Sequence, residues 1–282
     1  MNSRNEDATR TQPEPDPGTY AHMIYLADFL REGMIRRAIE SLRLPTGSRG
    51  LDAGCGIGSH CPLLAEAVGP GGHVMGLDLS ADFVARARDS AAELGLSDRV
   101  SYREGDIDRL PLKDNAFDWA WSVDCVAYHP AGLRMLREVA RVVKPGGTVA
   151  LLAWSSQQLL PGYPLLEAHL NATSLGTAPF TPGMKPEQHF LRALGWFHQL
   201  GFRQPGARTF VGDVHAPLSE LHRQAVLSLF DMRWGEPASE LSADDWALYQ
   251  RLRRPGSPDF ILDLPDYYAF FIYSMFYGTV PG

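Results

Sequence analysis

The stretch Leu51-Asp-Ala-Gly54-Cys-Gly56-Ile-Gly58 decides the fold class, because it stands between a predicted strand, residues 49–53, and a predicted helix that ends near Val68. Glycines at such a turn let the backbone bend sharply and approach a ligand without interference from a Cβ atom. The following helix directs free N–H groups toward an anionic group. Dinucleotide folds prefer G-x-G-x-x-G/A, whereas here the third glycine comes one residue early and Ser59 takes the last position. Asp52 would also repel a pyrophosphate, and it suits a cationic ligand instead.

Outward from this stretch, short apolar runs alternate with helical periodicity as far as residue 154. Ser80 is a suitable N-cap for a helix over 81–94, and Pro130 suits the first turn of a helix over 131–143. This alternation predicts an α/β fold with right-handed βαβ crossovers and a parallel sheet that has helices on both faces. The other predicted elements are one or two helices over 20–42, strands at 73–79, 100–104, 117–123, 148–154, 207–214 and 267–277, and helices at 162–175, 186–200, 217–234 and 242–253.

Composition excludes several classes of protein. The chain has 282 residues, 45% of them hydrophobic, which is enough for a sizeable core, and its net charge of −7 argues against a nucleic-acid partner. Three cysteines without a CxxC pair indicate neither a disulfide framework nor a metal site. No apolar run approaches the roughly 18 residues of a membrane span. Residues 1–19 have no hydrophobic segment, so we expect a disordered tail rather than a signal peptide, and a cytoplasmic protein.

Acidic residues accompany the first three predicted strands. Asp78 follows Gly56 by 22 residues, the separation at which a carboxylate can hold ribose hydroxyls. Asp106 follows the third strand and could accept a hydrogen bond from an exocyclic adenine amine. Because the carboxyl ends of parallel strands meet at one edge of a sheet, Asp52, Asp78 and Asp106 would face one crevice. Three carboxylates in that crevice suit a positively charged adenosyl ligand.

Five motifs resemble, in order, those of class I S-adenosylmethionine-dependent methyltransferases, in particular the small-molecule branch that contains the ubiquinone and menaquinone biosynthesis methyltransferases. The resemblance covers residues 45–155 and implies S-adenosylmethionine as cofactor, with S-adenosylhomocysteine as product. It also implies a Rossmann-like sheet of seven mostly parallel strands, an antiparallel last strand at 267–277, a helical N-terminal lid and helical insertions in the C-terminal half. The motifs are D-A-G-C-G-I-G from Asp52, G-L-D-L-S from Gly76, E-G-D-I from Glu104, L-P-L-K-D-N-A-F-D from Leu110 and E-V-A-R-V-V-K-P-G-G from Glu138.

The resemblance assigns roles to individual residues. The glycine motif would line the methionine end of the cofactor, with Asp52 near its ammonium group. Leu79 and Ile107 would pack against the adenine, and the backbone of Ser122 and Val123 would lie close to the sulfonium. The full set of candidate cofactor-binding residues is Asp52, Gly54, Cys55, Gly56, Gly58, His60, Asp78, Leu79, Gly105, Asp106, Ile107, Ser122 and Val123.

Methyl transfer needs a general base only when the acceptor must lose a proton. Three residues that follow the fourth predicted strand, Asp124, Tyr128 and His129, are the catalytic candidates. His129 precedes a proline and a helix, so a helix cap or a packed histidine explains it equally well. His22 and Tyr25, on the predicted lid helix, resemble substrate-contacting residues of such enzymes, but simple packing explains them equally well. The candidates for substrate contact are His22, Tyr25 and Trp154.

We expect one methyltransferase domain over residues 20–282. It would consist of lid helices at 20–44, a cofactor-binding core at 45–154, and substrate-side insertions with the last strands at 155–282. Aromatic residues of the last part would either line a pocket for a small aromatic or lipophilic metabolite or pack in the cores of helices. These residues are Trp196, Phe197, Phe230, Trp234 and Trp246.

The predicted reaction is in-line transfer of a methyl group to an oxygen or carbon atom of a small molecule, with nitrogen and sulfur left open as acceptors. Two alternatives also remain at this stage. The first is the same fold with non-methylating chemistry, and the second is a cofactor-binding accessory protein without turnover. The sequence leaves open whether the chain forms a homodimer.

Overall fold

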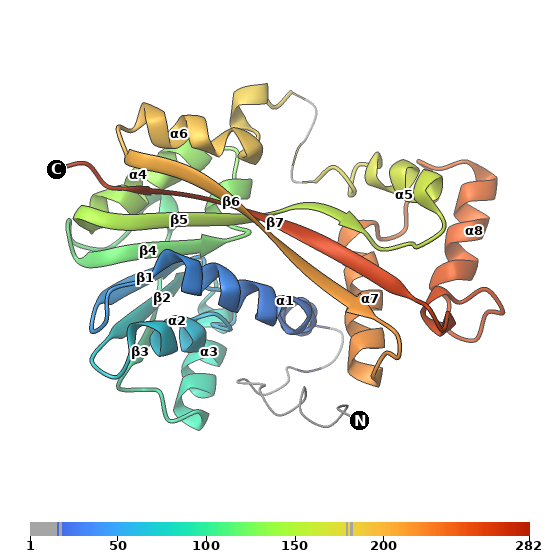
Figure 1. Ribbon diagram of the computed structural model, residues 1–282, viewed down its shortest axis with the longest axis horizontal. Coiled ribbons are helices and arrows are strands. Elements are labelled where there is room, and N and C mark those ends of the chain that lie inside the picture. The colour runs from blue at the N-terminus through green and yellow to red at the C-terminus, as the bar shows by residue number, and fades with distance from the viewer. Residues whose placement is uncertain (1–15, 17–18, 179, 181–182) are drawn as a thin grey trace.

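A seven-stranded sheet forms the centre of the computed structural model, which describes residues 16, 19–178, 180 and 183–282 (Figure 1). The strand order is β3-β2-β1-β4-β5-β7-β6. The first five strands pair in parallel, and β7 is antiparallel to both β5 and β6. The predicted sheet, including its antiparallel last strand, is confirmed. The strands are β1 (Arg49–Ala53), β2 (His73–Asp78), β3 (Val100–Glu104), β4 (Phe117–Val123), β5 (Val143–Gln158), β6 (Arg203–His215) and β7 (Tyr268–Thr279).

Side-chain hydrogen bonds define where several helices begin. Thr19, Ser80, Ser219 and Ser242 each accept a hydrogen bond from a backbone N–H three residues further on. Such caps satisfy donors that have no partner inside the helix. The helices are α1 (Tyr20–Leu42), α2 (Cys61–Val68), α3 (Ala81–Glu93), α4 (Gly132–Val142), α5 (Pro164–Asn171), α6 (Ala193–Gln199), α7 (Glu220–Arg233) and α8 (Ala243–Arg253).

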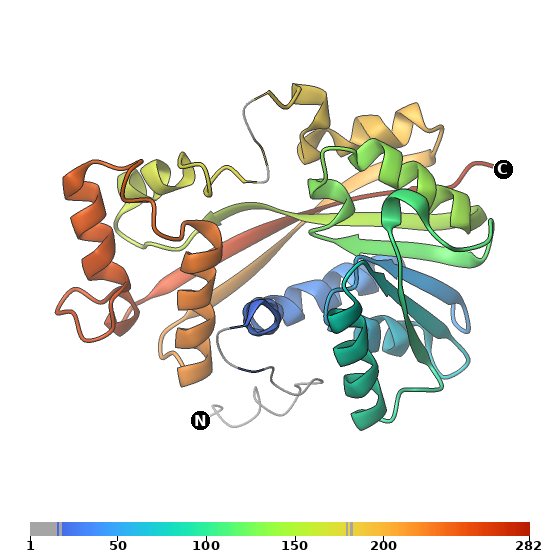
Figure 2. The ribbon, with the colours of Figure 1, turned by 180° about the vertical axis from the view of Figure 1, so that it is seen from behind.

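Helices cover both faces of the sheet (Figures 1 and 2). One hydrophobic core joins α1, α2 and α3 to one face, and a second core joins α4 and α6 to the other. Strand β5 shows how the sequence produces both cores, because Ala150 and Leu152 face the first and Val149 and Leu151 face the second. This alternation follows from the two-residue period of a strand.

Strands β5, β6 and β7 continue beyond the parallel part of the sheet and carry α5, α7 and α8, which surround a third core (Figure 1). The sequence predicted that the fifth strand ends at Trp154, but it continues to Gln158 because its last residues pair with residues 270–272 of β7. Strand β6 is also longer than predicted, since it pairs with β7 over most of its length.

The helices of the C-terminal half are shorter than their sequence periodicity predicted. Helix α5 covers only Pro164–Asn171 of the expected 162–175, and the expected helix 186–200 divides into two 3-10 turns followed by α6. The spacing of hydrophobic residues shows which side chains face a core, but it does not show where the backbone hydrogen bonds of a helix begin and end. The predicted tail, 1–19, lies mostly outside the described residues.

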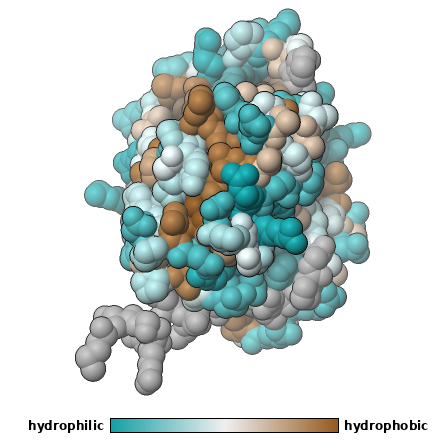
Figure 3. Space-filling model, turned by 90° about the vertical axis from the view of Figure 1, so that its right-hand side faces the viewer, coloured by the Kyte–Doolittle hydropathy of each residue, from teal (hydrophilic) through white to brown (hydrophobic). Residues whose placement is uncertain are grey.

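Helices α5, α7 and α8 lie at one end of the molecule. The surface of this end has a strip of hydrophobic residues among hydrophilic ones (Figure 3). Large apolar side chains exposed in this part of the chain include Leu165 and Tyr268. Within the described part of the chain, no helix combines the length and the apolar composition needed to cross a membrane.

Candidate functional site

The glycine motif turns between β1 and α2 with three residues in the left-handed region. Gly54, Gly56 and Gly58 have φ values of 80°, 54° and 84°. A Cβ atom on Gly54 would lie 2.4 Å from Sγ of Cys125, and one on Gly58 would lie 2.6 Å from the hydroxyl of Tyr102. A Cβ atom on Gly56 would meet nothing within 4 Å. Packing therefore requires the first and third glycines, and Gly56 is the one that borders open space.

Asp78, the last residue of β2, links this loop to the start of α3. Its carboxylate accepts hydrogen bonds from the backbone N–H groups of Gly56 and Ser80, each at 2.9 Å. An ionised carboxylate has about four acceptor positions, so capacity remains for two hydroxyl groups. The neighbouring Leu79 is 71% exposed, which leaves an apolar surface that a flat ring could cover. Both features fit an adenosyl group.

Asp106 and Ile107 lie after β3. One carboxylate oxygen of Asp106 caps the 3-10 helix Ile107–Arg109 by accepting the N–H of Asp108 at 2.8 Å. Ile107 is buried, and its side chain would lie 3.4 Å from a Cβ atom on Gly54. Gly105 donates its N–H to the carbonyl of Asp78 at 2.9 Å. This segment therefore lies beside both the glycine motif and the end of β2.

Asp52 is a buried carboxyl, 1% exposed, beneath the loop. The Cys61 thiol donates to one of its oxygens at 3.6 Å, while the other oxygen has no hydrogen-bond partner among the described residues. Burial raises the pKa of Asp52 to about 6, against the opposing effect of His60. A buried carboxyl with an unsatisfied oxygen can be stabilised by a cation, so this residue fits the ammonium group of the expected cofactor.

Binding of such a cation should release a proton from Asp52. A nearby positive charge lowers a carboxyl pKa, so at pH 6 we expect up to about half a proton per site to leave when S-adenosylhomocysteine binds, and close to none at pH 8. Titration calorimetry in two buffers of different ionisation enthalpy measures this number. The Asp52→Asn variant should lose the release at pH 6, and equal release from both proteins would contradict the assignment.

The remaining cofactor candidates lie around the same loop. Ser122 and Val123 are buried at the end of β4, where the Ser122 hydroxyl accepts the N–H of Val126 at 3.3 Å. The Cys55 thiol donates to the carbonyl of Gly56 at 3.7 Å, and burial raises its pKa well above the usual range. His60 precedes α2, with Nε2 lying 3.5 Å from a carboxylate oxygen of Asp28 on α1.

A polar network joins helix α1 to Asp124, directly after β4, and to Tyr273, in the middle of β7. One Nη atom of Arg31 lies 2.5 Å from the Asp124 carboxylate and 2.6 Å from the Tyr273 hydroxyl, which donates to the same carboxylate at 2.7 Å. Arg31 also pairs with Asp28 at 2.5 Å. Burial by itself would raise the pKa of Asp28, but Arg31 and His60 hold it well below its usual range. The lid helix is therefore attached to the core by buried charges.

The three catalytic candidates have different surroundings. Both oxygens of Asp124 are occupied, because the second one accepts the backbone N–H of Trp154 at 3.0 Å. The Tyr128 hydroxyl donates to the Trp154 carbonyl at 2.5 Å, and burial raises its pKa well above the usual range. His129 is exposed, and its Nδ1 accepts the N–H of Ala131 at 3.1 Å. The structure thus brings Asp124 and Tyr128 together around Trp154 and leaves His129 at the surface.

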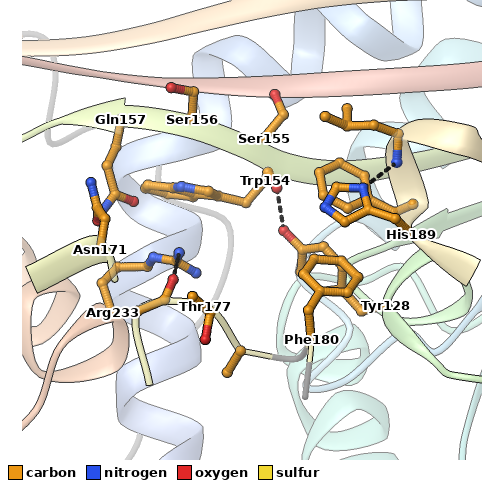
Figure 4. Close-up of a pocket in the computed structure, with 14 residues that line it drawn as sticks. Tyr128, Trp154, Ser155, Ser156, Gln157, Asn171, Thr177, Phe180, His189 and Arg233 are labelled. Atoms are coloured by element: carbon orange, nitrogen blue, oxygen red, sulfur yellow. Dashed lines mark hydrogen bonds between the residues drawn. The ribbon is translucent and has the colours of Figure 1, made fainter. Parts of the chain in front are cut away.

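A cavity of about 430 Å³ lies beside the last part of β5, at residues 154–157, and beside Tyr128, which follows β4 (Figure 4). Trp154 stacks on Phe271 with ring centroids 5.2 Å apart. Its ring lies at a polar end of the cavity, beside Gln157 and Arg233, and Phe180 and His189 lie at an aromatic end (Figure 4). A second hollow, of about 650 Å³, lies between the start of α1 and α3 and contains none of the predicted site residues. The 430 Å³ cavity is lined by Tyr128, Trp154, Ser155, Ser156, Gln157, Asn171, Gly176, Thr177, Ala178, Phe180, His189, Phe190, Leu191 and Arg233.

Of the predicted substrate contacts, Trp154 lines this cavity, and the two lid residues do not. Tyr25 is buried in a small core with Ile57 of the glycine motif. The ring centroids of His22 and Tyr25 lie 6.3 Å apart. The five aromatic residues considered for a pocket do not line this cavity. Trp196 and Phe197 belong to the second core, and Phe230, Trp234 and Trp246 pack in or against the third.

Several residues that line the cavity could not be predicted from the sequence. Arg233 ends α7, Asn171 ends α5, and Phe180 and His189 belong to the irregular segment between α5 and α6. None of them stands in a motif or at a periodic position that would single it out. They all lie within residues 155–282, the part of the chain predicted from the sequence to form the substrate side.

Comparisons with known proteins agree with this architecture. Residues 51–151 match the family described as "Methyltransferase domain". The chain is 36% identical over 120 residues to the methyltransferase GfsG of Streptomyces halstedii, covering 43% of this chain and 42% of that one. It is 34% identical over 128 residues to a demethylmenaquinone methyltransferase of Listeria monocytogenes, covering 45% and 53%. The chain thus spans about half the length of these curated relatives.

A solved structure extends the likeness of fold to most of the chain. Phosphoethanolamine N-methyltransferase 2 of Haemonchus contortus, in complex with S-adenosyl-L-methionine, superposes with a TM-score of 0.56 at 17% identity, covering 94% of this chain and 58% of that one. The sheet order and the antiparallel β7 are those of the class I methyltransferase fold. Residues 51–151 therefore match a methyltransferase domain, and the proteins similar to this part of the chain include a demethylmenaquinone methyltransferase.

Proposed function

We propose that this chain transfers a methyl group from S-adenosylmethionine to a small molecule bound in the 430 Å³ cavity. The observation that carries the proposal is the shared location of two sites. The glycine motif, Asp78 and Asp106 lie at the carboxyl ends of the first three strands, and the cavity lies just past the parallel pairing of β4 with β5, beside residues 154–157 of β5 and Tyr128 after β4. Ligands of open α/β sheets bind at the carboxyl ends of the strands.

The residues around the glycine motif would hold the cofactor, whose sulfonium supplies the methyl group. Asp78 would bind the ribose hydroxyls, Asp52 would face the ammonium group, and Asp106 would accept from the adenine amine. The open space at Gly56 and the exposed side chain of Leu79 support this arrangement. The contribution of the chain to the reaction is then mainly to position donor and acceptor, which can lower a barrier by about 7–11 kcal/mol.

Asp124 and Tyr128 act as positioning residues in this proposal. Asp124 is held by Arg31 and Tyr273 and accepts the N–H of Trp154, so it fixes the backbone of a residue that lines the cavity. The Tyr128 hydroxyl donates to Trp154, and its raised pKa disfavours the phenolate. We therefore expect that Tyr128 does not act as the base, so an acceptor that must lose a proton would give it to water or to another group. The attacking atom is an oxygen or carbon, with nitrogen and sulfur as further candidates.

Two measurements test the proposal. Calorimetry should show binding of S-adenosylhomocysteine, and absence of binding would contradict it. The full chain would then be incubated with methyl-labelled S-adenosylmethionine and an extract of its source organism separated by size. Label in the small-molecule fraction is the expected result. Label on protein or RNA would overturn the substrate class, and binding without label in any fraction would favour non-methylating chemistry or an accessory role.

A further inference from the structure

Arg233 places a positive charge at the polar end of the cavity. It ends helix α7 and lines the cavity beside Trp154, with its guanidinium carbon 5.6 Å from that ring centroid (Figure 4). One Nη atom donates to the carbonyl of Gly176 at 3.2 Å. Its Nε is buried and has no hydrogen-bond partner among the described residues. The guanidinium therefore has donors that no acceptor of the described residues satisfies.

The charge of Arg233 is not balanced within the described part of the chain. No carboxylate of the described residues lies within 4.0 Å of the Arg233 guanidinium. By contrast, Arg253, at the end of α8, pairs with both Asp231 and Glu236. The lining of the cavity contains no Asp or Glu, and burial lowers the pKa of its one histidine, His189. A half-buried guanidinium without a counter-charge is unfavourable unless an anion pairs with it.

The groups around Arg233 supply further hydrogen-bond donors. The Asn171 side-chain carbonyl already accepts from Gln157 at 3.0 Å and from Trp234 at 2.8 Å, so its amide nitrogen is the group left for a ligand. The indole N–H of Trp154 is also buried without a partner among the described residues, as is the Gln157 carbonyl. Two N–H groups at this end, on Arg233 and Trp154, thus lack an acceptor among the described residues.

The opposite end of the cavity presents flat rings. Phe180 and His189 stack with centroids 4.1 Å apart, and Phe190 meets Tyr128 edge-on at 5.4 Å. Leu191 donates its N–H to Nδ1 of His189, which places the proton of the neutral ring on Nε2. These surfaces suit a planar apolar group more than a polar or branched one.

We propose that the cavity binds a planar apolar acceptor that carries a carboxylate, with the carboxylate paired to Arg233. The planar guanidinium can form two parallel hydrogen bonds to a carboxylate, and its one protein acceptor among the described residues is the Gly176 carbonyl. The inference deepens the proposed function, on which it rests, because it names the substrate class of the same site. It also orients the acceptor, since the carboxylate lies at the end away from Tyr128 and the reacting end lies near β4.

Matched probes test this inference without turnover. The full chain, saturated with S-adenosylhomocysteine, is titrated by calorimetry with 2-naphthoate and with 2-naphthamide, which share shape and differ in charge. We expect the carboxylate to bind at least about tenfold more tightly, because a hydrogen-bonded charge pair is worth that much or more. The Arg233→Gln variant should lose this preference through weaker naphthoate binding, and Arg233→Lys should keep part of it.

Controls separate this effect from misfolding and from failure of the proposed function. Arg137→Gln changes an exposed arginine on α4 and should leave both probes unaffected. The Arg233 variants should still bind S-adenosylhomocysteine. Equal affinity for the two probes, failure of both to bind, or an unchanged preference in Arg233→Gln would overturn the inference, even with methyl transfer intact. If S-adenosylhomocysteine does not bind, the proposed function fails, and the probes still report on Arg233 in the ligand-free chain.

Discussion

Replacing Arg31 by methionine should destabilise the fold by about 3–5 kcal/mol, the typical cost of removing one partner from a buried ion pair. The Arg31 side chain is only 12% exposed, and it lies between the carboxylates of Asp28 and Asp124. Methionine would fill much of the volume but leave both carboxylates without their cation. Chemical denaturation at pH 7, followed by circular dichroism, measures the change in the free energy of unfolding.

The pH dependence gives this prediction a distinctive signature. In the wild-type protein the pKa of Asp28 lies well below its ordinary value of 3.8, so its stabilising contribution is present above about pH 3.8 and decreases as the pH falls below that value. Without Arg31 the burial effect remains and raises the pKa of Asp28 instead. The stability difference between the two proteins should therefore become smaller as the pH is lowered from 7 toward 4.

Arg36→Met is the matched control for Arg31→Met. Arg36 lies on the same helix and pairs with Glu32 and Glu66, but its side chain is 35% exposed. Exposed ion pairs contribute about 0–1 kcal/mol, so the loss should be small and nearly independent of pH. If both variants lose the same stability, the buried network does not attach the lid helix in the way described here.

Replacing Asp78 by alanine should weaken the binding of S-adenosylhomocysteine by at least about tenfold, since a hydrogen bond to a charged group contributes roughly 1.5–3 kcal/mol. The carboxylate would hold the ribose and also holds the N–H groups of Gly56 and Ser80. The variant therefore loses both the ligand contact and the support of the loop. Titration calorimetry measures the dissociation constant directly.

Two further variants separate the contributions to this effect. Asp78→Asn keeps the shape and one acceptor oxygen but removes the charge, so its loss of affinity should be intermediate. Asp82→Ala removes an exposed carboxylate from the first turn of the same helix, α3, and should leave the affinity unchanged. An unchanged dissociation constant in Asp78→Ala would mean that the ribose lies elsewhere.

The sequence by itself determined the sheet and the region of the proposed cofactor site. Strand and helix periods show which side chains face a core, and the alternation of elements leaves few topologies. The position of Asp78 was predicted in the same way, because the motif G-L-D-L-S contains both the end of a strand and the N-cap of the next helix. These features depend on neighbours within a few residues.

Only the tertiary structure decided what the predicted residues contact. Arg31 meets Asp124 across 93 positions of sequence and Tyr273 across 242, so no local pattern could reveal that Asp124 is held in an ion pair. The roles of Gly54 and Gly58 likewise depend on Cys125 and Tyr102, which reach them only when the sheet forms.

The cavity depends even more on the folded chain. Tyr128, Trp154, Asn171, His189 and Arg233 come from separate segments and converge because β5 and β7 extend past the parallel core. Extension of a strand is decided by the partner that satisfies its backbone groups, and that partner lies more than 100 residues away in the chain. Local periodicity can place a side chain on a face, but the identity of its distant neighbour is a property of the whole fold.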